Sequence, residues 1–178
     1  MYYEHILPGG AATVAQALDA ETRKFFEQIF LGTAMYDVLP ILPISATAAR
    51  LMDLPHLEFV RRNSVWLAEH DLRGVYALFV RALPPETVAL RLPKLALKYF
   101  DFGHTETRME SERLCVGEMQ GIPVVLSSWM QACIQGYVPT ALSIAGAKNP
   151  RVRMLEPTSR VSERPEGTTT LRIEIRWV

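Results

Sequence analysis

The final residues of the chain alternate strictly between apolar and polar side chains. The apolar members are Leu171, Ile173, Ile175 and Trp177, and the polar members are Thr170, Arg172, Glu174 and Arg176. A period of two residues is typical of a β-strand with one buried face and does not fit a helix. Residues 170–178 are therefore expected to form a strand whose apolar face is covered by another layer.

The rest of the chain divides near Gly103 into two regions of different pattern. Helix-like spacing of apolar residues dominates residues 1–102, whereas most of the strand-like alternation lies in residues 104–178. The helices expected in the N-terminal region cover about 20–31, 46–52, 53–70 and 71–82, with a further one from Pro84 that kinks or breaks at Pro93.

Local signals set the ends of these helices. Asp19 and Ser45 are candidate N-caps, because a short polar side chain can accept a hydrogen bond from a free amide of the first turn. Residues 39–43 are expected to be extended or turned, since each proline there disfavours helix at the residue before it.

The C-terminal region predicts strands on both sides of a long helix. The expected elements are strands over 105–119, 151–161 and 170–178, an apolar helix over 122–146, and a turn over 164–167. The order of these elements predicts an α+β fold. In this fold an N-terminal bundle of short helices precedes a predominantly antiparallel sheet of about three to five strands, which packs against the long apolar helix. We expect a single domain over 1–178, helical over 1–102 and with the order strand-helix-strand-strand over 103–178.

Composition excludes several classes of function. The chain has 178 residues, with 19 Lys plus Arg balanced by 19 Asp plus Glu, so its formal net charge is zero and gives no general attraction for nucleic acid. Two cysteines are too few for a disulfide framework. The start lacks the features of a signal peptide, and no apolar stretch of membrane-spanning length is uninterrupted. We therefore expect a cytoplasmic protein without a membrane span and without a nucleic-acid partner.

Candidate catalytic and metal-ligating residues are sparse. The four histidines form no HExxH motif, and the two cysteines form no CxxC motif. Asp101 and His104 are the best acid-base pair, although a polar turn is the simpler interpretation. Cys133 has apolar neighbours that favour an inert buried thiol, and Cys115 is expected to be semi-exposed in a strand. The prediction is therefore no catalytic residue and no metal site.

The apolar helix carries the strongest binding hypothesis. Trp129, Cys133 and Gly136 recur at helical spacing, and a mixture of aromatic and small residues can leave room for an apolar ligand or for a second helix. Plain packing against the sheet remains an alternative. The candidate ligand-binding residues are Phe100, Trp129, Met130, Cys133 and Tyr137, with Arg113 for an anionic group.

The C-terminal region also resembles a known ligand-binding fold. The segments that carry the likeness are ETRMESERLCVGEMQG, IPVVLSSWMQACIQGYV and VRMLEPTSRVSERPEGTTTLRIEIRW. They resemble the fold shared by the 4-vinyl-reductase-type domain, the haem-NO-binding group and the TRAPP transport subunits. In the N-terminal region, LPILPISATAARLMDLP and RLPKLALKYFDFG resemble a group of myxobacterial proteins of similar length and without an assigned activity.

The resemblance implies a small-molecule sensor or a scaffold that dimerises. The chain lacks the YxSxR motif with which the NO sensors contact haem, and no histidine lies in the apolar helix, which argues against haem and leaves the cofactor open. It also lacks the cysteine and histidine cluster that some 4-vinyl-reductase-type domains use for metal.

Three functional hypotheses follow, in this order. The first is a non-catalytic regulatory or sensory domain that binds an apolar small molecule, works as a homodimer and acts on a signalling protein. The second is a protein adaptor without a small ligand, and the third is an enzyme of unknown reaction. A final strand at an exposed sheet edge would offer one way for two copies to pair.

Overall fold

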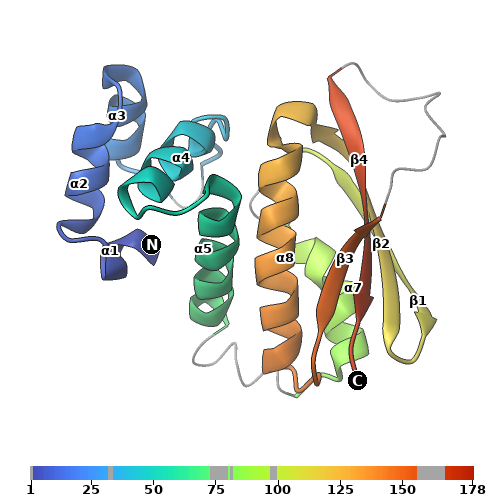
Figure 1. The fold of residues 1–178 in the computed structure, drawn as a ribbon. Helices are drawn as coiled ribbons and strands as arrows, with labels where there is room; N and C mark the ends of the chain where they lie inside the picture. The colour runs from blue at the N-terminus through green and yellow to red at the C-terminus, as the bar shows by residue number, and fades with distance from the viewer. Residues whose placement is uncertain (1, 32–33, 73–79, 81, 97–99, 156–166) are drawn as a thin grey trace.

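The molecule consists of three layers (Figure 1). The computed structural model describes residues 2–31, 34–72, 80, 82–96, 100–155 and 167–178. Short N-terminal helices form the first layer, the long helix α8 lies in the middle with α7 beside it, and a twisted sheet forms the third layer. The prediction of an α+β fold with helices against an antiparallel sheet is confirmed.

The first layer is a bundle of short helices, as expected. Its members are α1 (Tyr2–Ile6), α2 (Gly10–Ala17), α3 (Ala20–Glu27), α4 (Ile41–Leu51) and α5 (His56–Asp71). Asp19 caps α3 as predicted, since its Oδ1 accepts the Thr22 amide at 2.9 Å. However, α3 ends at Glu27, four residues before the predicted end.

The expectation of an extended or turned segment over residues 39–43 is confirmed for residues 39–40, which form a turn, and is wrong from residue 41 onward. Helix α4 begins at Ile41, and Pro43 lies in its first turn. A proline is tolerated there because the first amides of a helix have no carbonyl partner within the helix. Ser45 is consequently not a cap: its hydroxyl lies inside α4, donates to the Ile41 carbonyl at 2.6 Å and is 2.7 Å from His56 Nε2.

Helix α7 (Pro85–Ala96) continues through Pro93, where a kink or break was expected. Together with α8 it covers the inner face of the sheet, and its buried Val88 and Ala89 belong to the same hydrophobic cluster as that face. The predicted helix over 71–82 falls largely outside the described residues.

The sheet has four antiparallel strands in the order β1-β2-β4-β3. They are β1 (His104–Ser111), β2 (Leu114–Pro123), β3 (Arg151–Leu155) and β4 (Thr168–Arg176). The single strand expected over 105–119 is thus a hairpin of β1 and β2. Its turn, Glu112-Arg113, contains neither glycine nor proline and so gave no turn signal in the sequence. The predicted strand over 151–161 is described as far as Leu155, and the predicted turn over 164–167 lies, apart from Gly167, outside the described residues.

The final strand alternates in burial as predicted, with Leu171, Ile173 and Ile175 buried. It does not lie at an edge, however, because β2 and β3 pair with it on its two sides. Pairing between two copies through β4 is therefore ruled out in this fold, and the corresponding expectation is wrong.

Helix α8 (Ser127–Ile144) follows β2 through the short 3₁₀ helix Val124–Leu126. It is shorter than the predicted 122–146 because Ile122 and Pro123 still belong to β2. The face of α8 that packs on the sheet lies over Cys115. Cys115 was expected to be semi-exposed but is fully buried, because residue 115 points inward and its two neighbours point outward. Among the described residues, no helix combines the length and the apolar character that a membrane span requires.

Candidate ligand site at the junction of two cores

Two hydrophobic cores meet along α8. We call the first the sheet core: it lies between the sheet and α7 and α8, and it includes Met130, Ile134 and Leu142 of α8 together with Ile173 and Ile175 of β4. The second, the helical core, lies among α1, α2, α4, α5 and one face of α8, and includes Val14, Ile44, Ala48, Phe59 and Ala132. Helix α8 therefore shares its buried side chains between two cores.

Trp129 lies where the two cores join. Its indole is half-buried, and it packs against both the sheet core and the helical core. Phe100 contacts it edge-on, with ring centroids 6.4 Å apart, and Phe102 lies 5.2 Å from Phe100. These three aromatic rings come from the start of α8 and from the segment that leads into β1, so only the tertiary fold brings them together.

Further along the junction, α5 and α8 approach each other at backbone distance. A Cβ on Gly136 would overlap the Arg61 carbonyl oxygen and lie 2.9 Å from the Ser64 Cβ. The absence of a side chain at residue 136 therefore lets the two helices touch. No flat ligand fits between them at this point.

Cys133 of α8 faces α5 and lies one turn before Tyr137. Burial raises the pKa of the Cys133 thiol to about 12, and a hydrogen bond from Ser64 offsets only part of this effect. Burial also raises the pKa of the Cys115 thiol. Both cysteines are therefore protonated at neutral pH and are poor nucleophiles and poor metal ligands.

The remaining predicted binding residues lie apart from the aromatic group. Met130 points into the sheet core. Tyr137 reaches the end of α5, where its hydroxyl is 3.5 Å from Asp71 Oδ2. Arg113 lies in the exposed turn between β1 and β2, where its carbonyl accepts the Trp177 amide. That turn is at the opposite end of β2 from the start of α8, where Trp129 lies, so the structure does not bring Arg113 to Trp129.

The described residues also form two hollows that the sequence did not indicate. One, of about 1070 Å³, lies between α3 and the segment that leads into α4. The other, of about 320 Å³, lies between the first turns of α5 and α8 and is lined by Glu58, Arg61, Gln131 and Gln135, among others. None of the six predicted binding residues lines either hollow. Polar residues scattered over two helices carry no sequence motif, so no signal would have found these hollows.

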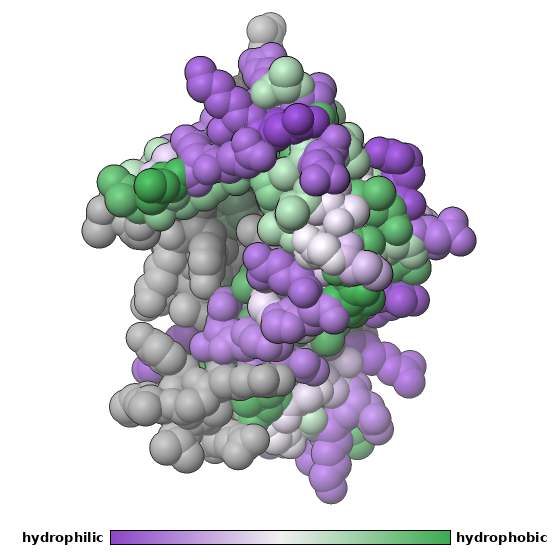
Figure 2. All heavy atoms as spheres, turned by 90° about the vertical axis from the view of Figure 1, so that its left-hand side faces the viewer, coloured by the Kyte–Doolittle hydropathy of each residue, from purple (hydrophilic) through white to green (hydrophobic). Residues whose placement is uncertain are grey.

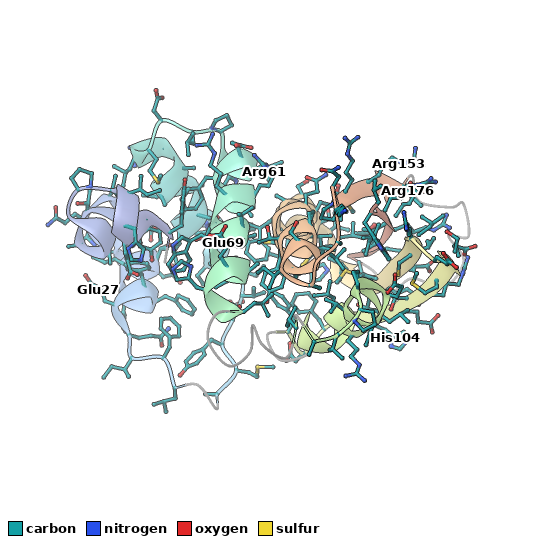
Figure 3. All side chains as sticks on the ribbon, turned by 90° about the horizontal axis from the view of Figure 1, so that it is seen from below. Glu27, Arg61, Glu69, His104, Arg153 and Arg176 are labelled. Atoms are coloured by element: carbon teal, nitrogen blue, oxygen red, sulfur yellow. The ribbon has the colours of Figure 1, made fainter. Side chains whose placement is uncertain are left out.

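Charged candidates elsewhere are satisfied locally. His104 is exposed at the start of β1 (Figure 3). Its ring lies 3.2 Å from Glu106 Oε1, and its described contacts do not include Asp101. Arg61 and Arg62 both bond to Glu58 and lower its pKa to about 2. Within the described ranges, no group of three or more His, Cys, Asp or Glu side chains could hold a metal ion.

The architecture is that of H-NOX domains. An oxygen-binding H-NOX domain related to soluble guanylate cyclases, in its oxygen complex, matches with a TM-score of 0.67 and 10% identity, over 94% of this chain and 86% of that one. The Fe(II) unliganded H-NOX protein from K. algicida matches with a TM-score of 0.62 and 8% identity, over 94% and 85%. A point variant of T. tengcongensis H-NOX matches with a TM-score of 0.60 and 12% identity, over 94% and 92%.

No protein-family model matches the sequence, and no curated protein matches it either. The chain thus has the H-NOX fold across almost its whole length. At about a tenth of identical residues, this likeness shows the fold and leaves the ligand to be argued from the chain's own side chains.

Proposed function

We propose that this protein is a non-catalytic, small-molecule-binding regulatory domain that works as a dimer. The observation that supports it most is the H-NOX fold over 94% of the chain, whose solved examples include a ligand complex. The second support is Trp129, an aromatic side chain shared by two cores, because ligand sites favour such junctions between packed units.

The proposed site lies around Phe100, Trp129 and Cys133. An apolar molecule there would bind one packing of α8 against α5 more tightly than another and so shift the population between them. Pro139 offers a place for such a difference, since it has no amide hydrogen for the Gln135 carbonyl and so weakens α8 near its middle. Arg113 has no role in this site. The altered packing would change the contact of this domain with a second copy or with a signalling protein.

The described residues near the proposed site offer haem iron neither a histidine nor a thiolate ligand. Haem iron is held by His, Cys, Tyr or Met side chains. Neither α7 nor α8 carries a histidine. Of the four histidines, His56 is held by Ser45 and His104 lies outside on the sheet; His70 stacks on Trp66, and His5 contacts the same ring. The Cys133 thiol stays protonated, and the helices touch at Gly136. The proposal therefore includes no haem-dependent step.

Native mass spectrometry of gently purified protein tests the ligand. A mass excess that is present in the native spectrum and absent after denaturation indicates a bound molecule, and its value starts the identification. The variant Trp129→Ala should lose this excess. The matched control is Trp66→Ala, which removes another half-buried indole outside the proposed site. Equal loss in both variants would point to general destabilisation, and retention in Trp129→Ala would overturn the site.

A protein adaptor without a small ligand is the second candidate. An exposed run of large apolar side chains after α3 favours it, because such patches mark contact with other proteins. A clean unliganded mass for the wild-type protein would move this candidate to first place.

A further inference from the structure

The connection from α3 to α4 presents an unusual amount of apolar surface. Ile29 is 85% exposed, Leu31 61% and Met35 57%. Phe30 and Tyr36, in the same segment, are also exposed. We call these five residues the apolar arm. Figure 3 shows this connection looping out from the helices, and Figure 2 shows hydrophobic surface on the part of the molecule that projects to one side.

The apolar arm is held in place by its own contacts. Phe30 packs edge-on against Phe25 at 5.4 Å and against Tyr36 at 4.9 Å between ring centroids. The Tyr36 hydroxyl accepts the Leu31 amide at 2.7 Å. These contacts join Phe30 and Leu31 to Phe25 and Tyr36, while the side chains of Ile29, Leu31 and Met35 remain exposed to solvent. A segment with this many apolar side chains gains free energy if they are buried against a partner.

A groove of about 1070 Å³ lies directly beside the apolar arm. Its apolar lining includes Phe25, Leu39 and Pro43, and its charged lining includes Lys24, Glu27 and Asp37. Lys24 and Glu27 form no ion pair within the described residues, and Asp37 bonds only to the Leu39 amide there. The apolar arm and a partly apolar groove therefore lie next to each other on one surface, and the groove lining carries charges of both signs.

This combination favours one occupant. A nucleic acid or an anionic membrane would meet the carboxylates of Glu27 and Asp37 as well as Lys24, so a partner of a single sign is poorly matched. A second copy brings charges of both signs, and a two-fold axis would place the apolar arm of each copy in the groove of the other. We propose that the apolar arm and the adjacent groove form the interface of a homodimer, with Ile29 and Leu31 as its central contacts.

This inference deepens the dimer of the proposed function and is independent of the ligand. The interface lies on α3 and α4, and α4 packs on α5, which touches α8 at Gly136. A change in the packing of α8 could thus be passed to the partner copy through α5 and α4.

Analytical ultracentrifugation over a range of concentrations tests the interface with the full chain. Wild-type protein should show a concentration-dependent dimer. The double variant Ile29→Ser/Leu31→Ser should raise the dissociation constant of the dimer by at least about tenfold, which corresponds to losing about 1.4 kcal/mol of binding free energy. The matched control is Val124→Ser/Val125→Ser, which removes two apolar side chains of similar exposure, 55% and 61%, from the segment just before α8. This control should dimerise like the wild type.

Hydrogen exchange locates the interface independently of any substitution. Amides of Ala20–Glu27 should exchange more slowly as the protein concentration rises through the dissociation constant. A dimer that survives in the arm variant would overturn this interface and leave the dimer of the proposed function standing. A wild-type protein that is monomeric throughout would overturn both, while ligand binding would remain testable by mass. A monomer whose apolar arm binds phosphatidylcholine vesicles would assign the surface to a membrane and overturn the dimer.

Discussion

Gly136 is the residue whose side chain, or lack of one, most directly sets the geometry of the junction. In the interior of α8, alanine would normally be preferred over glycine by about 1 kcal/mol. At this position the added Cβ would overlap the Arg61 carbonyl, which belongs to the backbone of α5 and cannot rotate away. The packing term therefore outweighs the helix propensity.

We predict that Gly136→Ala lowers the free energy of unfolding by about 2 kcal/mol, the usual scale of overpacking. Urea titration followed by circular dichroism measures it. Gln135→Ala, at the neighbouring exposed residue, is the control and should change stability by less than about 0.5 kcal/mol. A Gly136→Ala protein as stable as the wild type, or more stable, would mean that α5 and α8 can separate at no cost.

At the scale of elements, α3 is a helix that is held mainly by polar contacts and not by buried side chains. None of its residues is buried. Its N-terminal half is fixed by polar contacts: Asp19 caps the first turn, and the Arg23 guanidinium donates to the carbonyls of Ala15, Gln16 and Leu18 at 2.7 to 3.0 Å. Because α3 supports the apolar arm, its stability bears on the proposed interface.

We predict that Asp19→Ala speeds amide exchange in Ala20–Glu27 several-fold, while Asp19→Asn, which can still cap, changes it little. The bonds from Thr22 hold the pKa of Asp19 below its ordinary value. The contribution of the ionised cap is therefore complete above that ordinary value and is lost as the pH falls through the lowered pKa. An NMR titration of the Thr22 amide measures this directly. A midpoint at or above the ordinary value for aspartate would contradict the cap.

At the scale of the whole molecule, the two cores share α8. The strongest link between the helical layer and the rest is the contact of α5 with α8, and Trp129, Ala132 and Cys133 of α8 all pack into the helical core. Unfolding of the first layer would expose one side of α8, and loss of α8 would uncover the inner face of the sheet. The single domain over 1–178 therefore stays our prediction for the cooperative unit.

We predict one unfolding transition for both cores. Trp66 lies in α5 and Trp177 in the sheet core, so variants that keep only one of these tryptophans, with Phe at the other two positions, report on each layer separately. Their fluorescence midpoints in urea should coincide, each referred to the far-ultraviolet circular dichroism of the same variant. Two separately folding units would show a different result: the fluorescence midpoint would lie below the circular dichroism midpoint in one single-tryptophan variant and above it in the other.

The sequence by itself determined which segments become strands or helices and which faces are apolar. The alternation over 170–178, the Asp19 cap and the apolar run that becomes α8 are local patterns, and local patterns report the period of the backbone. This was enough for the α+β class and for placing Trp129 and Cys133 on the candidate helix. Local rules gave the wrong result at two places. Pro43 lies in the first turn of α4, where a proline is tolerated, and the turn Glu112-Arg113 contains no residue that marks a turn.

Only the tertiary structure decided which surfaces meet. It placed β4 inside the sheet, turned one face of α8 toward the sheet and another toward α5, joined Phe100 to Trp129 and left Arg113 far from both. Periodicity shows that a face is apolar but does not name its partner, because the partner comes from a distant segment of the chain. The contact of Gly136 with α5 and the groove beside the apolar arm arise from such distant pairings, and no pattern in the sequence marks them.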